Sequence, residues 1–224
     1  MAKPGPVFLY DVRMRIDPAG YPFVGVSLLL ALAGGLWGGW AVAGLFLVFA
    51  GFFLFFFRDP DRVVTDGPLA VLSPADGRVM VAGAPAGQGA PPGEWLQVTI
   101  FLSPMDVHVN RMPVGGRVTR VEYHPGRFLP AYKLEAGDLN EHTEVWLDHD
   151  GQTIVVRQIV GVLARRIVCR TKAGAAVKAG ERFGVMKFGS RMDVFLPTDA
   201  SIRVAVGEKV VGAVTVLAEL AHGR

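Results

Sequence analysis

The segment Gly184–Pro197 reads GVMKFGSRMDVFLP, and it holds a Gly-Ser pair inside a run that otherwise has the composition of a β-strand. Glycine in the interior of a strand weakens it and often marks a bulge or a close backbone approach. A turn at Gly189 and Ser190 is the simplest interpretation. The alternative is that the chain is cut between these residues, which requires a group that activates the Ser190 hydroxyl.

Residues 58–224, which include this segment, consist of short β-rich runs separated by turns of Gly, Pro and Asp. Such spacing is typical of an all-β domain, so we predict a mainly β fold, a sandwich or barrel-like domain with few helices. Segment 84–94 is a loop by composition, and segment 125–144 is long enough to be a functional loop. The strand-like runs include GRVMVAG, WLQVTIFL, RVTRVEYH, TEVWLD, TIVVRQIVGVLA, RIVCR, SIRVAV and KVVGAVTVLAEL.

An apolar block, residues 21–57, precedes the β region and contains no charged residue. As a single helix it would be about 55 Å long, which is too long for one crossing of a hydrocarbon core of about 30 Å. Two Gly-Gly pairs lie near its middle and are expected to break the helix. We therefore predict a membrane-associated helical hairpin with arms at 23–34 and 41–57. The short first arm also leaves a re-entrant hairpin open.

The charge and cysteine content of the chain limit its possible partners, metal sites and location. The formal net charge is +3, and no basic cluster indicates a nucleic-acid partner. Cys169 is the only cysteine, which excludes an internal disulfide and a cysteine-based zinc site, and we expect no metal. Basic residues occur in the N-terminal segment 1–20 and, after the apolar block, at Arg58 and Arg62. Both flanks fit the cytoplasmic side of a cell membrane.

Three polar residues could together activate a hydroxyl group. Asp76 lies in a Pro-Ala-Asp-Gly turn, His108 follows Asp106 after an apolar strand, and Ser190 follows Gly189. A histidine can take the proton of a serine while an aspartate fixes the tautomer of the imidazole ring. From spacing alone the case is weak, because each residue also has a plain structural interpretation, as a turn residue or a polar group at a strand end.

Seven motifs resemble, in order and over nearly the whole chain, those of the phosphatidylserine decarboxylase family of the short bacterial and archaeal type. Each motif alone is modest, but their order is highly specific. They are FFRDPDR, LSPADGRV, FLSPMDVHVNRMPVGG, GRFLPAY, NEHTEV, QIVGVLARRIVCR and GVMKFGSRMDVFLP.

The resemblance implies a self-cleaving proenzyme that depends on a pyruvoyl group. Ser190 would attack the Gly189 carbonyl, and cleavage would yield a large subunit, 1–189, and a small subunit, 190–224, that begins with a pyruvoyl group. This built-in cofactor would decarboxylate phosphatidylserine in the membrane to phosphatidylethanolamine, with Asp76 and His108 as the charge-handling residues. The family also implies a higher oligomer.

The sequence departs from the family pattern at two positions. Longer members carry a second histidine where this chain has Arg111, which leaves Asp76 or His108 as the base for self-cleavage. His142 stands where relatives commonly have arginine, so it is either a headgroup contact or a surface residue. Arg165 and Arg166 are further candidates, because guanidinium groups bind lipid phosphate.

Two other functions remain open from the residues. The run VKAGERFGVMKFGS resembles lipoyl and biotinyl carrier domains, in which Lys187 would be the modified lysine. A membrane-anchored serine hydrolase could use Ser190, although the Gly-x-Ser-x-Gly motif is absent. An intact-mass measurement separates these cases, because a carrier gains mass on a lysine whereas the proenzyme splits in two.

Overall fold

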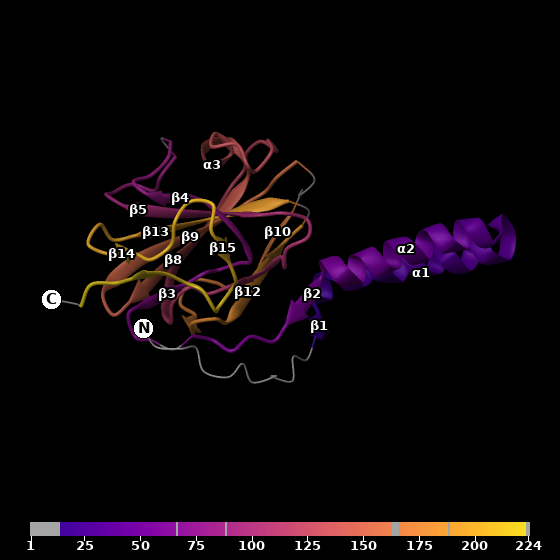
Figure 1. The fold of residues 1–224 in the computed structure, drawn as a ribbon, viewed down its shortest axis with the longest axis horizontal. Coiled ribbons are helices and arrows are strands. Elements are labelled where there is room, and N and C mark those ends of the chain that lie inside the picture. Colours follow the sequence, from indigo (N-terminus) through magenta and orange to yellow (C-terminus); the bar gives the residue numbers. More distant parts are fainter. Residues whose placement is uncertain (1–13, 66, 88, 163–165, 188, 223–224) are drawn as a thin grey trace.

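The protein is described by a computed structural model that covers residues 14–65, 67–87, 89–162, 166–187 and 189–222. A long helical hairpin projects from one side of a β-rich domain, and the strands β1 and β2 form the junction between them (Figure 1). The expected order of a hairpin followed by a β domain is confirmed. The bounds of the junction strands are Met14–Ile16 for β1 and Arg58–Pro60 for β2.

The hairpin consists of α1 (Tyr21–Ala33) and α2 (Trp40–Phe56), joined by the π-turn η2 (Gly34–Gly38) and preceded by the short helix η1 (Pro18–Gly20). The predicted arms therefore agree with the helices to within two residues at either end. Gly34 permits the helices to meet, since a Cβ there would lie 2.8 Å from the Cγ1 atom of Val42. Gly39 then reverses the chain with a φ of 86°.

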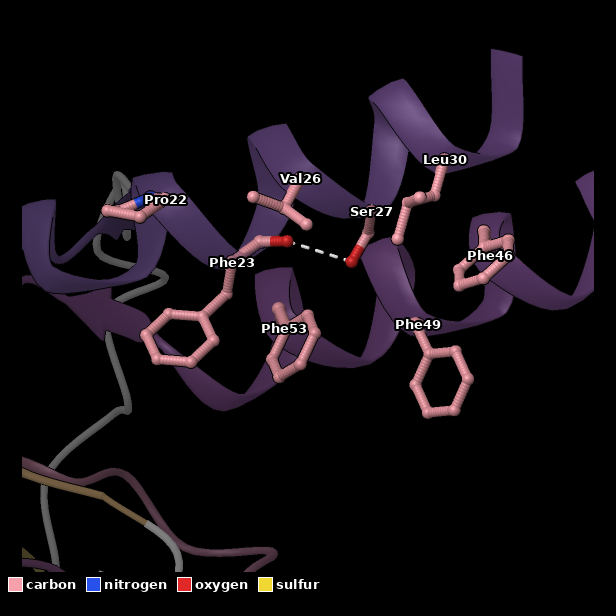
Figure 2. A pocket seen from close by; sticks show the side chains of 8 residues that line it. All are labelled: Pro22, Phe23, Val26, Ser27, Leu30, Phe46, Phe49 and Phe53. Carbon is pink, nitrogen blue, oxygen red and sulfur yellow. Dashed lines mark hydrogen bonds between the residues drawn. The ribbon is translucent and has the colours of Figure 1, made fainter. Parts of the chain in front are cut away.

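The surface of the hairpin is apolar and largely exposed. At its tip, Trp37 and Trp40 are 83% and 88% exposed. The helical stretch Pro18–Gly38 has 21 residues and contains an 18-residue window with a mean hydropathy of 1.7, so it is long and apolar enough to cross a membrane. An apolar groove of about 400 Å³ lies between the helices, where the only hydroxyl, that of Ser27, donates to the carbonyl of Phe23 (Figure 2). These features suggest membrane association.

The β domain is built on one eight-stranded sheet in which every neighbouring pair is antiparallel. Its order is β11-β7-β8-β9-β13-β5-β4-β15, so β13 lies near the centre of the sheet. The bounds are β4 (Gly77–Gly83), β5 (Leu96–Leu102), β7 (Gly116–His124), β8 (His142–His149), β9 (Gln152–Ile159), β11 (Ala176–Val177), β13 (Ser190–Leu196) and β15 (Lys209–Val210).

Two three-stranded sheets, with the orders β10-β12-β6 and β14-β16-β3, complete the domain. Apolar side chains of all three sheets meet in one core. The predicted mainly β domain with few helices is thus confirmed, and α3 (Ala136–Leu139) is its one helix among the described residues. The remaining bounds are β3 (Ala70–Leu72), β6 (Val109–Arg111), β10 (Ile167–Cys169), β12 (Arg182–Met186), β14 (Ser201–Ile202) and β16 (Val216–Glu219).

The two faces of the large sheet differ in chemistry. Alternate residues of a strand point to opposite faces, and Met192 and Val194 of β13 belong to the apolar core. Between them, Asp193 points to the other face, where it binds the fully buried guanidinium of Arg191 at 2.7 Å. Arg191 also donates to the carbonyl of Leu134, so the 125–141 connection covers this polar face. Ser190, two residues before Met192, belongs to the core face.

Candidate active site

Gly189 and Ser190 lie where the chain passes from one sheet to another. β12 ends at Met186 in a three-stranded sheet, and β13 begins at Ser190 in the eight-stranded sheet. The predicted interrupted strand is therefore two strands with different partners. Gly189 has a φ of 71°, a left-handed conformation that glycine adopts without the steric cost of a Cβ. The glycine thus permits the bend that brings the chain into β13.

The Ser190 side chain is buried without a polar partner. Its exposure is 0%, and its Oγ atom has no hydrogen-bond partner among the described residues. An unpaired buried hydroxyl costs about 1–3 kcal/mol. Such a group in a native structure calls for an explanation, and a catalytic role is one of those known. Here it adjoins the left-handed Gly189, whose carbonyl is the group that Ser190 would attack.

The backbone at Gly161 lies directly against the Gly189 carbonyl. A Cβ at position 161 would overlap the Gly189 carbonyl oxygen and would lie 3.2 Å from its carbonyl carbon. It would also lie 3.4 Å from the Cβ of Ala131, so the space is closed on that side as well. Only glycine lets the backbone after β9 come this close to the Gly-Ser bond.

His108 is buried and held in a single tautomer. Its exposure is 0%, and its Nδ1 lies 3.0 Å from the carbonyl oxygen of Asp106. A carbonyl accepts only, so Nδ1 carries the proton and Nε2 keeps a free lone pair. No described residue bonds to Nε2. Burial lowers the pKa of His108 to about 4, against partial compensation by Asp106. The imidazole is therefore neutral at pH 7 and able to accept a proton.

His108 and Ser190 lie on neighbouring connections between the same two sheets. The connection from β5 to β6 carries His108, and the connection from β12 to β13 ends at Ser190. The two run antiparallel, because Ser190 pairs with Leu102 at one end and the amide of Met186 donates to the carbonyl of His108 at the other. The sequence prediction that His108 belongs to the same region as Ser190 agrees with this arrangement.

Two polar side chains that the sequence analysis missed lie on the core face with Ser190. Gln158 of β9 donates to the Oδ1 atom of Asn110 at 2.8 Å. Gln158 pairs with Met192, so its side chain lies on the same face as Ser190. The Nδ2 atom of Asn110 and the Oε1 atom of Gln158 are buried and have no partner in the described part of the chain. The region therefore holds an unused donor beside an unused acceptor.

Asp76 and Ser190 lie at the same end of the sheet, but they do not contact each other. Asp76 precedes β4, and β5 separates β4 from β13, so the two residues are two strand spacings, or about 10 Å, apart. The carboxylate binds Arg62 at 2.8 Å and accepts from the amide of Gly212 at 2.8 Å. Burial raises its pKa, and Arg62 works against that shift. Asp76 and Ser190 therefore form no hydrogen bond with each other.

Arg111, which replaces the second histidine of longer relatives, has a structural role. Its guanidinium binds Asp59 at 2.9 Å and donates to the carbonyls of Pro60 and Gly180. Both ion-pair partners are buried. These contacts tie β6 to β2 at the base of the hairpin, and a guanidinium does not act as a base because it does not lose its proton.

His142, a candidate headgroup contact, lies on the polar face of the sheet and not on the face of Ser190. His142 on β8 pairs with Ile159 on β9, and Ile159 pairs with Arg191 on β13, so the three side chains lie on the same face of the sheet. The His142 ring stacks on His124 at 4.6 Å, and their nitrogens lie with a carboxylate oxygen of Glu144 within 4.8 Å of one another, as metal ligands do. Both Glu144 oxygens, however, already accept hydrogen bonds, from Arg157 and Trp146. The cluster is best described as an ion-paired network.

Two basic side chains stand near the base of the hairpin. Arg166 is exposed, and Arg165 lies outside the described residues. Lys187 is half-buried with its Nζ atom 5.0 Å from the ring centre of Phe23 on α1. Burial and the charge of Arg166 lower the pKa of Lys187, so the two cations are close enough to repel each other. An anion that binds between them would relieve that repulsion.

Comparisons with known proteins agree with these motifs and this geometry. Residues 49–218 match the sequence model of the family described as phosphatidylserine decarboxylase. A phosphatidylserine decarboxylase proenzyme of Gluconacetobacter diazotrophicus is 45% identical over 225 residues, covering 93% of this chain and 96% of that protein. The proenzyme of Desulfotalea psychrophila is 38% identical over 209 residues, covering 93% and 98%. The chain therefore belongs to the phosphatidylserine decarboxylase family.

Proposed function

We propose that this chain is a self-processing enzyme that converts phosphatidylserine to phosphatidylethanolamine and carbon dioxide in phospholipid biosynthesis. The names of its relatives support this reaction and a proenzyme precursor. The observation that carries the proposal is the buried, unpaired Ser190 hydroxyl beside the left-handed Gly189, with the neutral His108 on the neighbouring connection. These are the parts that a self-cleaving Gly-Ser bond needs.

Self-cleavage proceeds through an ester between the two future subunits. The Oγ atom of Ser190 attacks the carbonyl carbon of Gly189, His108 takes the hydroxyl proton, and the peptide C–N bond breaks as the ester forms. Loss of the Cα proton of Ser190 then breaks the ester C–O bond and releases residues 1–189 as a carboxylate. The remaining dehydroalanine takes up water and loses ammonia, which leaves a pyruvoyl group. The unpaired Nδ2 atom of Asn110 is suited to stabilise the oxyanion of the first step.

We assign the base of this step to His108 and not to Asp76. The carboxylate of Asp76 already has two partners, Arg62 and the amide of Gly212, and it lies across β5 from Ser190. His108 has a free Nε2 lone pair and a pKa of about 4, so it is unprotonated at neutral pH. Asp76 acts indirectly instead, by holding Arg62. Asp76→Asn should therefore retain self-cleavage, whereas His108→Gln should accumulate uncut chain on a time course of denaturing gels.

The site suits a pyruvoyl group in the place of Ser190, because that side chain is completely buried and its Oγ atom has no partner among the described residues. When present, the group supplies the carbonyl that accepts the electrons released with carbon dioxide. His108 holds and returns protons at Nε2, and the buried setting excludes water. We expect Arg166 and Lys187 to bind the lipid phosphate at the base of the hairpin, because their like charges lie close together there.

The two subunits should stay together after cleavage. β13, at the start of the small subunit, pairs with β9 on one side and β5 on the other, and β16 pairs with β3. The hairpin holds the complex at the membrane, and the basic residues that flank it favour the cytoplasmic side. We also infer assembly into a higher oligomer, by resemblance to the family.

A decarboxylation assay tests the proposed function. The purified chain is incubated with phosphatidylserine in mixed micelles, and released carbon dioxide and phosphatidylethanolamine are measured. We expect turnover from the native chain and from Ser201→Ala, an exposed control serine on β14. We expect none from Ser190→Ala, which has no hydroxyl for processing. Full turnover by Ser190→Ala would refute the proposal.

The alternative functions are less well supported. A carrier lysine must swing freely, but Lys187 is half-buried and packs over Phe23. The sequence around Ser190 lacks the Gly-x-Ser-x-Gly motif that a serine hydrolase of that type would carry. The family membership of the chain also favours the decarboxylase.

A further inference from the structure

The last residue of the hairpin covers the imidazole of His108. The ring of Phe56, at the end of α2, lies 4.2 Å from the imidazole between ring centres, with an interplanar angle of 33°. Both side chains are 0% exposed. The contact is long-range in the sequence, since it joins an apolar hairpin to a residue of the candidate active site. Part of the wall around His108 is therefore built by the hairpin and not by the β domain.

The same end of the hairpin is fastened to the connection that carries His108. The guanidinium of Arg58 donates to the carbonyl of Phe55 at 2.8 Å and to the carbonyl of Met105 at 2.6 Å. It thereby bridges the last turn of α2 and the connection from β5 to β6. Phe56 and Phe57 also form a cluster with Val185 of β12, the strand that leads to the Gly-Ser bond. A shift of the hairpin would thus reach both neighbouring connections.

The hairpin is locked to the β domain on its other side as well. The amide of Asp17, just before the hairpin, donates to the carbonyl of Phe57 at 2.8 Å. The carboxylate of Asp17 forms an ion pair with Arg170, which follows β10. Gly20 fits directly against Phe57, because a Cβ there would lie 2.6 Å from the aromatic ring. The two ends of the hairpin therefore meet the domain as one close-packed unit.

The Phe56 ring that covers His108 is apolar, and few charged groups act on the imidazole. The charged groups that act on the ring are Asp106 on its own connection, which raises its pKa, and Arg58 on β2, which lowers it. Among the described residues, α2 contributes the aromatic ring of Phe56, and β12 contributes the Met186 amide, which bonds the His108 carbonyl. With Asp106 and Arg58 opposed, burial is the main cause that keeps the imidazole neutral.

We propose that Phe56 is a positioning residue for His108: the seated hairpin holds the imidazole in its reactive, unprotonated state, so that hairpin docking and self-cleavage are coupled. This inference rests on the proposed function of His108 as a base. Removal of the ring would admit water beside the imidazole and would allow it to take up a proton at a higher pH. A purely structural role for Phe56 would lower the amount of folded protein without changing how His108 titrates.

The test measures the titration of His108 apart from the reaction. In the uncut Ser190→Ala chain in detergent micelles, histidine ring signals are followed by NMR against pH, and His108→Gln identifies the signal. Phe56→Ala should move the midpoint of His108 from about 4 toward 6.5, by up to about 2.5 units. Phe56→Leu, which keeps an apolar cover, should shift it less. Phe49→Ala, a ring 44% exposed on the same helix, should leave the midpoint unchanged.

The second measurement is the rate of self-cleavage in chains that keep Ser190. If Phe56→Ala shifts the midpoint fully to 6.5, the neutral fraction of His108 at pH 5 falls from about nine-tenths to about one-thirtieth. This variant should therefore cleave up to about 30-fold more slowly at pH 5 than at pH 7.5. The native chain and Phe49→Ala should change little over that range. An unshifted midpoint, or an equal loss at both pH values, would overturn the inference. Absence of cleavage in the native chain would refute the proposed function instead, while the titration still reports on Phe56.

Discussion

Gly161→Ala should slow self-cleavage without removing a catalytic side chain. The new methyl group would overlap the Gly189 carbonyl oxygen by about 1 Å, measured against a normal carbon–oxygen contact of roughly 3.3 Å. The nearest alternative direction is closed by Ala131, which is already 3.4 Å away. The carbonyl that Ser190 attacks must therefore move. A misplacement of about 1 Å costs about 100-fold in rate, so we expect cleavage to slow by about that factor.

The assay is a time course of denaturing gels on freshly purified chain at pH 7.5, with thermal unfolding measured in parallel. Gly115→Ala is the matched control, because its Cβ would meet only ordinary contacts of 3.5 Å. We expect the control to cleave at the native rate, and the uncut Gly161→Ala chain to unfold cooperatively. If folded Gly161→Ala cleaved within a few-fold of the native rate, the close approach of residue 161 to the Gly-Ser bond would have no role.

Three further predictions follow from the buried polar groups. The pKa of His108 is about 4 in the folded chain and near 6.5 in the unfolded chain, so the unfolded chain binds more protons between these pH values. The free energy of unfolding should therefore fall by up to about 3 kcal/mol as the pH drops from 7 to 4. Chemical denaturation of Ser190→Ala with and without His108→Gln checks this, and an equal pH slope in both would contradict it. Asn110→Asp should slow self-cleavage by about 100- to 1,000-fold on the gel time course, since it loses the oxyanion donor; a native rate would exclude that role. Arg191→Met removes the ion-pair partner of the buried Asp193, so the free energy of unfolding measured with denaturant should fall by about 3–5 kcal/mol. Removal of the exposed Arg203–Glu219 ion pair should lower it by about 1 kcal/mol or less. Equal losses of stability in the two variants would argue against the buried polar face.

The elements that the sequence predicts well are those with a local signal. The hairpin follows from a long apolar block with Gly-Gly pairs at its middle, and its arms agree with α1 and α2. The strand β5 follows from alternation, because Val98 and Ile100 enter the core while Gln97 and Thr99 take the polar face. Local composition is sufficient for these elements, because the pattern of apolar and polar residues within one segment already shows which side chains face the core.

The parts that escape prediction depend on partners distant in the sequence. Nothing local in GVMKFGSRMD says that β12 and β13 join different sheets, since that depends on pairing with Val109 and with Leu102. Asn110 and Gln158 each read as an ordinary polar residue within a strand, and the bond between them spans 48 residues. The position of His142 on the far face follows from strand register, which its residue type does not reveal.

Intact-mass spectrometry of the purified protein tests the central claim most directly. Self-cleavage predicts two chains in equal amounts, one ending at Gly189 and the other beginning at position 190. The small chain should be blocked to N-terminal sequencing. It should be lighter than a serine-initiated peptide by the mass of one ammonia, because a pyruvoyl group has lost the serine hydroxyl and carries a keto oxygen in place of the amino group. Ser190→Ala should give one chain of full mass. A single full-length mass in a preparation that decarboxylates phosphatidylserine would contradict the account.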